Sequence, residues 1–532
     1  KFIQQQNPKI SILFGDILGL YLLITIGKTI SNIWSYDPAS LYNLITEKGF
    51  NFIKTFPFVK ALIDKERESV DKLVEEEMKS KIRAMGEQYL TLPQNGKSSE
   101  EIISFLQSLV KKEDLVWENG RVSGSVYHGN REHQKLLNDA FGLYSLANPL
   151  HPDMWPSSTK LEAEIISMTA NLMTTKLKTL CGSTSSGGTE SILLATKTHR
   201  EYFRTKYDIT EPEIIACVSA HAAIDKACGL LGIRLIKVPM DPKTWKIDLN
   251  AVRKAISPNT IMLYGSAPQY PQGVIDDIAG LSDIAVQYNI GLHVDCCLGG
   301  FILPFARKLG YNIPAFDFDL PGVTSMSVDT HKFGYTLKGI SVVLYRTPEL
   351  RRAQYFCCPK FPGGLYSTPA IAGSRSSGII VQCWASMIKL GEAGYLKHTA
   401  DILNAVSTIH NGIIKDIPEL EIMGQSEAMI VCFRSKNEDA LKTYGIGYKM
   451  IKKGWGLNLL QYPIGIHLCC TVQTVGHEQE FLKDLRDSID EIILNGTGHI
   501  GGTAAVYGSA AVFPSGPVEE VMKGYQDAIY RV

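Results

Sequence analysis

Short segments with the residue types of β-strands alternate with helical segments along the middle of the chain. The five clearest strand segments span residues 213–219, 234–239, 261–266, 291–295 and 324–329. This alternation is typical of a predominantly parallel sheet that is covered by helices on both faces. A further segment, 341–345, follows the last of them after a short connection, and we expect it to be an antiparallel strand. The sequence therefore predicts an α/β fold.

Charged residues stand at the ends of two strands of this predicted sheet. Asp295 ends the strand 291–295, and Lys332 lies in a tight His331-Lys332 turn after the strand 324–329. Because ligands bind at the carboxyl ends of parallel strands, we expect Asp295 and Lys332 to lie at the same edge. Such a lysine can form a Schiff base with the aldehyde of pyridoxal phosphate, and the carboxylate can keep the pyridine nitrogen protonated. A solvated strand end is the alternative if the Ser-x-x-x-His-Lys pattern is taken alone.

A run of small residues from Cys181 to Glu190 leads into a helical segment. The free N–H groups and the dipole at a helix start favour an anion, so the sequence predicts a phosphate cradle. The residues of this cradle are Ser185, Ser186 and Gly187. A simple N-terminal cap is the alternative, but the run is longer than a cap needs. His221 follows the strand 213–219 and is a candidate to stack on the pyridine ring, with a buried core histidine as the alternative.

The composition limits the other classes of function. The 54 basic and 54 acidic residues balance to a net charge of zero over 532 residues, so nothing favours nucleic-acid binding, and the length allows two or three domains. The eleven cysteines include no Cys-x-x-Cys motif, which favours a reducing compartment. The histidines are scattered and no His-Glu-x-x-His motif occurs, so we expect no metal site.

An apolar segment near the beginning of the sequence predicts a membrane anchor. Residues 10–26 carry a single charge, Asp16, and an extension to Trp34 makes the segment long enough for the roughly 30 Å apolar core of a bilayer. A buried core helix is the alternative. Residues 52–85 are strongly charged and have apolar residues at helical spacing, which predicts a solvated helical stalk or arm.

Several motifs together resemble the sphingosine-1-phosphate lyases. They read VSGSVY, ANPLHPD, CGSTSSGGTESILLA, SAHAAIDKA, PQGVID, HVDCCLGG, SVDTHKFGYTLKG and GGLYSTPAIAGSR. The resemblance extends from Gly120 to the C-terminus and includes the N-terminal anchor. Residues 185–188 read Ser-Ser-Gly-Gly instead of Thr-Ser-Gly-Gly, and residues 295–297 read Asp-Cys-Cys instead of Asp-Ala-Cys. Both departures exchange one small residue for another in loops that contribute mainly backbone.

The resemblance implies a fold-type-I pyridoxal phosphate enzyme related to the group II amino-acid decarboxylases. Its large cofactor-binding domain would span residues 116–390 and contain a mostly parallel seven-stranded sheet with helices on both faces. A smaller α+β domain would span residues 391–532. We assign residues 1–50 to the membrane helix and its flank and residues 51–115 to the stalk.

The resemblance also assigns roles to individual residues. The predicted catalytic residues are Lys332 as the Schiff-base lysine, Asp295 as the partner of the pyridine nitrogen, His221 as the stacking histidine and Tyr127 at the reacting centre. The residues expected at the cofactor are Ser185, Ser186, Gly187, His221, Asp295, His331, Lys332, Gly363 and Gly364. Those expected at the substrate phosphate are Tyr127, Asn148, His151, Lys338 and Tyr366. The loop that contains Gly363, Gly364 and Tyr366 is expected to reach across a homodimer into the partner's site.

The implied reaction is a retro-aldol cleavage of phosphorylated long-chain bases. It breaks the C2–C3 bond and releases a long-chain fatty aldehyde and phosphoethanolamine. The implied enzyme is a homodimer in the endoplasmic reticulum membrane, with one membrane span and its catalytic domain facing the cytosol. A pyridoxal phosphate-dependent amino-acid decarboxylase and a non-catalytic membrane scaffold are the alternatives. The base for the C3 hydroxyl proton stays open between Lys332 and a neighbouring tyrosine or histidine.

Overall fold

The computed structural model describes residues 56–57, 76, 80, 82–113, 116–174, 176–496 and 515–530. Residues 116–496 belong to one compact unit, and residues 82–113 and 515–530 belong to another. The predicted membrane segment 10–34 and most of the charged segment 52–85 lie outside the described residues. No helix in the described ranges is both long and apolar enough to span a bilayer.

The larger unit is built on a seven-stranded sheet with the strand order β1-β7-β6-β5-β4-β2-β3. Its strands are β1 (Cys181–Ser185), β2 (Glu213–Cys217), β3 (Arg234–Val238), β4 (Thr260–Ser266), β5 (Gly291–Asp295), β6 (Ser325–Val328) and β7 (Ser341–Tyr345). Strands β2 to β6 pair in parallel, and β7 is antiparallel to both of its neighbours, β6 and β1. The mostly parallel sheet and its antiparallel exception are therefore confirmed.

Strand β1 is an element that the sequence did not predict. Its sequence, Cys-Gly-Ser-Thr-Ser, consists of small residues that rarely favour a strand in isolation. All five residues nevertheless pair with β7, in a register that runs from Cys181 opposite Tyr345 to Ser185 opposite Ser341. Tertiary pairing thus overrides weak local propensity, and the small-residue run forms both a strand and the start of the next helix.

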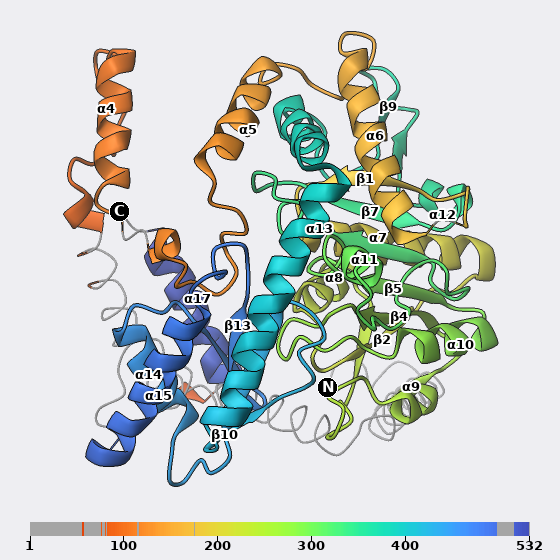
Figure 1. The fold of residues 1–532 in the computed structure, drawn as a ribbon. Coiled ribbons are helices and arrows are strands. Elements are labelled where there is room, and N and C mark those ends of the chain that lie inside the picture. Colours follow the sequence, from red (N-terminus) through yellow and green to blue (C-terminus); the bar gives the residue numbers. More distant parts are fainter. Residues whose placement is uncertain are drawn as a thin grey trace, which may run out of the picture. The chain divides into compact units, whose positions relative to one another are not determined.

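Helices cover both faces of the sheet (Figure 1). The helices of this unit are α5 (Arg131–Leu143), α6 (Pro156–Met173), α7 (Gly188–Tyr207), α8 (Ala223–Leu231), α9 (Leu249–Ala255), α10 (Ile278–Tyr288), α11 (Leu303–Lys308), α12 (Pro348–Arg352), α13 (Ser377–Asp416), α14 (Thr443–Lys452) and α15 (Glu478–Asn495), after a short 3-10 helix at Val116–Asn119. Helices α7, α8 and α12 lie on one face, and α6, α9, α10 and α13 lie on the other.

Side chains along β7 point alternately to the two helix-covered faces of the sheet, and this explains its sequence. Val342 and Leu344 pack into the core cluster that includes residues of α6, α10 and α13, whereas Val343 and Tyr345 pack against Leu194 of α7. Strand side chains alternate between the two faces, so a strand that is buried on both faces is apolar at every position. This explains the continuous Val-Val-Leu-Tyr run in β7.

A second sheet follows the long helix α13. It has the order β10-β11-β13-β12, with β10 (Leu420–Ile422), β11 (Ile430–Ser435), β12 (Asn458–Gln461) and β13 (Ile464–Cys469), and all its pairs are antiparallel. Helix α13 runs across the predicted domain boundary at 390/391, and its backbone leaves helical geometry at Gly391 (φ 56°). The four predicted domains themselves stay a prediction.

The smaller unit contains α4 (Ser99–Val110) and α17 (Ser515–Ile529). Helix α4 begins with a capping box, in which Ser98 accepts from the Glu101 N–H and the Glu101 carboxylate accepts from the Ser98 N–H. Its apolar residues Ile102, Ile103, Leu106 and Val110 are exposed.

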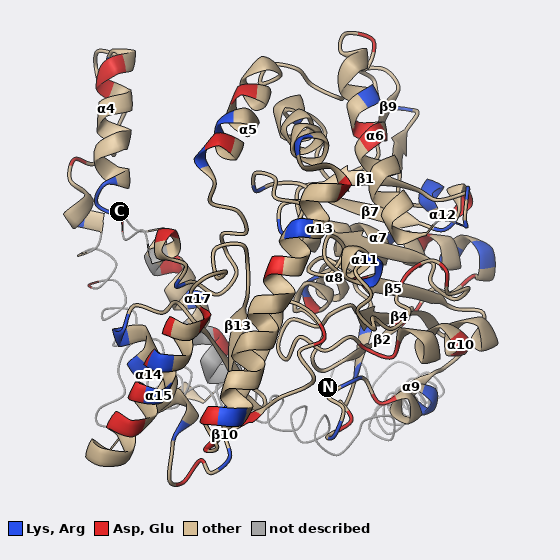
Figure 2. Cartoon of the chain, viewed as in Figure 1, with Lys and Arg blue, Asp and Glu red and all other residues tan. Residues whose placement is uncertain are grey.

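Charged residues are concentrated on helices and loops, and the central strands contain almost none (Figure 2). Strands β1, β4, β6 and β7 have no charged residue, and β5 has only Asp295. A lone carboxylate in the middle of a buried sheet needs a compensating partner, because burial of an unpaired charge is strongly unfavourable. The fold therefore singles out the end of β5 as a functional position.

Candidate active site

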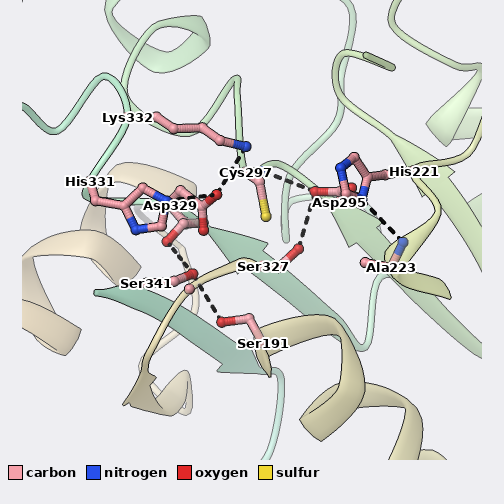
Figure 3. Close-up of polar contacts among 12 residues, drawn as sticks. Ser191, His221, Ala223, Asp295, Cys297, Ser327, Asp329, His331, Lys332 and Ser341 are labelled. Atoms are coloured by element: carbon pink, nitrogen blue, oxygen red, sulfur yellow. Dashed lines mark hydrogen bonds and ion pairs between the residues drawn. The ribbon is translucent and has the colours of Figure 1, made fainter. Parts of the chain in front are cut away.

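Lys332 lies in the turn after β6, and its closest charged partner is Asp329. The Lys332 ammonium is 3.0 Å from Asp329 Oδ2, and Asp329 is only 2% exposed. Burial alone would lower the pKa of Lys332, but the Asp329 carboxylate and other nearby anionic groups raise it above its ordinary value. Figure 3 shows Lys332, His331 and Asp329 on one side of the site and Asp295 with His221 on the other, with Cys297 between them.

Asp295 ends β5, and its carboxylate accepts three hydrogen bonds. Tyr264 donates to Oδ2 at 2.6 Å, and the Cys297 N–H and the Ser327 hydroxyl donate to Oδ1 at 3.1 Å and 3.3 Å. Burial opposes the charged form, but His221, the hydrogen bonds from Tyr264 and Cys297, and the nearby charge of Lys332 hold the pKa of Asp295 below its ordinary value. Asp295 is therefore an anion in spite of its burial.

His221 follows β2 and lies beside Asp295 (Figure 3). Its Nδ1 accepts a hydrogen bond from the Ala223 N–H at 3.1 Å, which leaves the ring proton on Nε2. The prediction that His221 lies at the site, rather than in the apolar core, agrees with this position.

The predicted phosphate cradle lies where β1 ends and α7 begins. The Ser185 hydroxyl is bonded to Ser191, which in turn is bonded to Ser341 of β7, so the end of β1 is fixed to the neighbouring strand. The Ser186 N–H is bonded to the Glu190 carboxylate. As in any α-helix, the first N–H groups of α7 have no acceptor within the helix, and they can bind an anion.

The backbone at the start of α7 lies very close to side chains of the site. A Cβ atom at Gly188 would lie 2.7 Å from Cys297 Sγ and 2.8 Å from Asp329 Oδ2, so only glycine fits. A Cβ atom at Gly187 would lie 3.3 Å from His331 Cε1. The His331 ring therefore packs over the helix start, and the turn after β6 and the cradle form one site.

Tyr127 and Lys338 extend the site beyond Lys332. The Lys338 ammonium lies 4.5 Å from the centre of the Tyr127 ring, and the Tyr127 ring packs edge-on against Phe333 at 4.8 Å. Partial burial of its ammonium group and the charge of Lys332 lower the pKa of Lys338 to about 8. Burial raises the pKa of Tyr127, so its hydroxyl stays protonated.

The remaining predicted residues are not part of this cluster within one chain. These residues are Asn148, His151, Gly363, Gly364 and Tyr366. No hydrogen bond or ion pair among the described residues connects any of them to Lys332, Asp295 or His221. The Asn148 side chain instead donates to Ser374 Oγ at 3.1 Å. His151, Gly363, Gly364 and Tyr366 are all exposed.

Three residues of the cluster were not predicted from the sequence. Asp329 forms an ion pair with Lys332, and the Tyr264 hydroxyl and the Cys297 N–H donate hydrogen bonds to Asp295. The signal for Asp329 was present, since it is a charged residue that ends the predicted strand 324–329, three residues before Lys332. In the sequence Tyr264 looks like an ordinary core residue of a strand. Its contact with Asp295 depends on the pairing of β4 with β5, which the sequence does not show.

The residues present fit pyridoxal phosphate. His331 Nδ1 and Asp329 Oδ1 are buried and have no hydrogen-bond partner in the described part of the chain, as expected for groups that face a ligand. The anion site at α7, the lysine and the single carboxylate on β5 match the phosphate, the aldehyde and the ring nitrogen of the cofactor. All of them lie at the carboxyl edge of the sheet.

Comparison with known proteins agrees with this chemistry. Residues 84–436 match the family described as pyridoxal-dependent decarboxylase conserved domain. The chain is 43% identical to the sphingosine-1-phosphate lyase of Dictyostelium discoideum over 488 residues, which cover 91% of this chain and 90% of that protein. It is 44% identical to the sphingosine-1-phosphate lyase of Oryza sativa subsp. japonica over 485 residues, or 90% and 88% of the two chains. The solved structure of the Burkholderia pseudomallei sphingosine-1-phosphate lyase aligns with a TM-score of 0.74 and 41% identity, over 77% of this chain and 95% of that one.

Proposed function

Because the chain belongs to the sphingosine-1-phosphate lyase family of pyridoxal phosphate-dependent enzymes, we propose that Lys332, Asp295 and His221 form its catalytic centre. The protein is a pyridoxal phosphate-dependent lyase that cleaves sphingosine 1-phosphate in sphingolipid metabolism. Its fold is the fold-type-I α/β fold of the pyridoxal phosphate-dependent decarboxylases. The observation that carries the assignment of the residues is that Asp295 ends β5 and Lys332 lies in the turn after β6, and that β5 and β6 are neighbouring parallel strands.

Each predicted cofactor residue has one task in this proposal. When bound, pyridoxal phosphate supplies an aldehyde that condenses with amines and a ring that accepts the electrons of a breaking carbon–carbon bond. Lys332 would bind the aldehyde, Asp295 would keep the ring nitrogen protonated, and His221 would lie beside the ring. The phosphate is held by His331 and by the cradle at the start of α7, which consists of Ser185, Ser186 and Gly187.

Proton transfer at the substrate is assigned to Lys332, with Tyr127 as a hydrogen-bond donor. Once the substrate amine takes its place at the cofactor, Lys332 would be a neutral amine beside the substrate and could accept a proton. We assign the C3 hydroxyl proton of the substrate to this amine, which gives a long-chain fatty aldehyde once the C2–C3 bond breaks. The proton then returns to the C2 fragment, which leaves as phosphoethanolamine. The Tyr127 hydroxyl stays protonated and orients the substrate.

Lys338 and Tyr127 are the proposed binding residues for the substrate phosphate within the same chain. A lysine whose pKa is about 8 is mostly charged at neutral pH and can pair with a phosphate dianion. Its position over the Tyr127 ring keeps the ammonium group beside the reacting centre. A phosphorylated head group explains why two lysines lie so close together in one site.

The proposal includes a homodimer in which Asn148, His151, Gly363, Gly364 and Tyr366 reach the active site of the neighbouring subunit. Its support is an exposed apolar surface around these residues. Leu146 is 92% exposed and Leu365 is 90% exposed, and the other members are Leu143, Met154, Phe361 and Ile371. Soluble proteins rarely leave so many apolar side chains exposed without a partner.

The exposed residues belong to one surface. Asn148 is hydrogen-bonded to Ser374, and the neighbouring Gly373 packs against the Tyr366 hydroxyl. The helices α5 and α6 and the strand β9 (Tyr366–Thr368), which carry or flank this surface, lie at the same end of the unit (Figure 1).

Subunit mixing tests the homodimer and its composite site. We expect Lys332→Ala and Tyr366→Ala to be almost inactive alone, because each destroys every site of its homodimer. After subunit exchange, half of the sites in each mixed dimer are intact, so the mixture should recover about a quarter of the wild-type activity. A mixture that stays as inactive as its components would contradict the composite site, and a monomer by light scattering would contradict the dimer.

We also propose that residues 10–34 form a single span in the endoplasmic reticulum membrane and that the catalytic domain faces the cytosol. The apolar composition of this segment supports a span, and eleven free cysteines support a reducing compartment. A deletion of residues 1–50 should release the enzyme from membranes without loss of turnover. A deletion variant that stays in the membrane fraction after alkaline extraction would exclude this anchor.

The activity itself is tested with purified protein, pyridoxal phosphate and sphingosine 1-phosphate. We expect equal amounts of long-chain aldehyde and phosphoethanolamine, and neither product from Lys332→Ala. Release of carbon dioxide from amino acids without aldehyde formation would instead identify a decarboxylase.

A further inference from the structure

The three hydrogen bonds to Asp295 leave one position open on its carboxylate. A carboxylate has about four acceptor positions, two on each oxygen. Both positions on Oδ1 are filled, by the Cys297 N–H and the Ser327 hydroxyl, and one position on Oδ2 is filled by Tyr264. The remaining position on Oδ2 is the one available to a ligand, so Tyr264 and a cofactor ring nitrogen would share one oxygen atom.

The donors come from both strands that flank β5. Tyr264 is on β4 and Ser327 is on β6, and both are fully buried. They lie on the face of the sheet that α7 covers, since their strand neighbours Leu263, Met326 and Val328 pack into the cluster of the opposite face. The carboxylate is therefore fixed from two sides within the rigid part of the fold.

The donor on β6 belongs to a longer chain of hydrogen bonds. Ser327 has one hydroxyl proton, which it gives to Asp295, so it accepts from His293 Nε2 at 3.2 Å. His293 Nδ1 must then accept from the Ser325 hydroxyl at 2.8 Å. Burial lowers the pKa of His293 to about 3, so this chain is neutral and the negative charge stays on Asp295.

We propose that Tyr264 is a positioning residue of the cofactor site, whose hydroxyl holds Asp295 in its charged form and leaves a single acceptor position for the ring nitrogen. This inference rests on the role proposed above for Asp295. In a buried acid–base pair the proton lies on the more basic partner, and a donor to the carboxylate makes the carboxylate less basic. Tyr264 therefore keeps the proton on the ring nitrogen, where it is needed for the ring to accept electrons.

The test replaces Tyr264 with phenylalanine and uses Tyr345→Phe as the matched control. Tyr345 is equally buried in the same sheet, and its hydroxyl makes an equally short bond of 2.6 Å, to Gln354 rather than to the site. The first readout is the dissociation constant of pyridoxal phosphate, which should rise about tenfold in Tyr264→Phe because the pKa of Asp295 rises without this donor and the carboxylate then pairs less well with a protonated ring nitrogen. Tyr345→Phe should bind the cofactor as the wild type does.

The second readout is a pH titration of the visible absorbance of the bound cofactor. If the ring nitrogen of Tyr264→Phe is no longer protonated, a positive charge near the Lys332 nitrogen disappears, and the titration moves to higher pH. The titration of Tyr345→Phe should coincide with that of the wild type. A purely structural effect of losing a buried hydroxyl would alter thermal unfolding in both variants and shift neither titration.

The outcomes separate this inference from the proposed role of Asp295. If Asp295→Asn shifts the titration and Tyr264→Phe does not, the inference about Tyr264 is wrong and the role of Asp295 stands. If neither variant shifts it, the role of Asp295 is wrong as well. Should Tyr264→Phe fail to fold, Tyr264→Met removes the same hydroxyl with a flexible apolar side chain that adapts to the core, and an unchanged titration there would overturn the inference.

Discussion

Replacing Asp295 with asparagine changes one buried charge and almost no volume. The Cys297 N–H is a fixed backbone donor to Oδ1, so the amide oxygen of the new side chain must stay on that side. The amide NH₂ group then takes the place of Oδ2, where it faces the Tyr264 hydroxyl, which can rotate and accept. A donor now stands at the open position, so the ring nitrogen of the cofactor becomes an acceptor and carries no proton.

The expected loss follows from the burial of this pair. Removing one partner of a buried ion pair costs about 3–5 kcal/mol. If the transition state bears the whole loss, kcat falls by a factor of about 10² to 10⁴, at roughly 1.4 kcal/mol for each tenfold change. The protein without cofactor should be less stable than the wild type, because a pKa of Asp295 below its ordinary value means that the carboxylate charge stabilises the folded state at neutral pH.

The assay is the release of long-chain aldehyde at saturating substrate and cofactor, together with thermal unfolding. Asp317→Asn is the control, since Asp317 is also a buried aspartate with a backbone N–H donor and a charged partner, Arg307, away from the site. We expect the control to lose stability and keep its kcat. An Asp295→Asn enzyme with a kcat within about tenfold of the wild type would refute the reasoning, because the charge would then have no role in the transition state.

Three further variants address the other parts of the site. Lys338→Met should raise KM for the phosphorylated substrate more than it lowers kcat. The wild-type KM should rise as the pH passes about 8, because Lys338 then loses its charge. If the variant and the wild type share the same dependence of KM on pH, this role of Lys338 is wrong. Gly188→Ala should prevent cofactor binding, measured by dialysis, because its methyl group would overlap the Cys297 sulfur, and tight binding would show that the helix start is not so constrained. Asp329→Asn should lower the pKa of Lys332, because the neighbouring carboxylate charge is lost. The rate at which cofactor-free enzyme binds pyridoxal phosphate should then reach its plateau at a lower pH than in the wild type. An unchanged pH profile would rule out Asp329 as the source of the raised pKa.

The parts of the site that the sequence predicted are those that depend on the position of a residue in its own strand. Asp295 and Lys332 follow predicted strands that turned out to be neighbours, so their approach was a consequence of the parallel sheet. His221 was predicted for the same reason. In each case local sequence and sheet topology were sufficient, and no knowledge of side-chain packing was needed.

The parts that it missed depend on pairing between distant segments. Strand β1 has weak propensity and exists because it pairs with β7, more than 150 residues later in the chain. The contact of Tyr264 with Asp295 requires the register of β4 against β5, which the sequence alone does not specify. Asn148 and Tyr366 match the family by motif, but no hydrogen bond or ion pair among the described residues connects them to Lys332, and the role proposed for them requires a second subunit.

The central claim is that Lys332, rather than the nearby Lys338, carries the cofactor. The most direct measurement is to reduce the purified enzyme with borohydride, which fixes pyridoxal phosphate to the amine that holds it, and to map the modified peptide by mass spectrometry. We expect one modified residue, Lys332, and no modification in Lys332→Ala. Modification of Lys338, or of neither lysine in enzyme that still cleaves sphingosine 1-phosphate, would contradict the account.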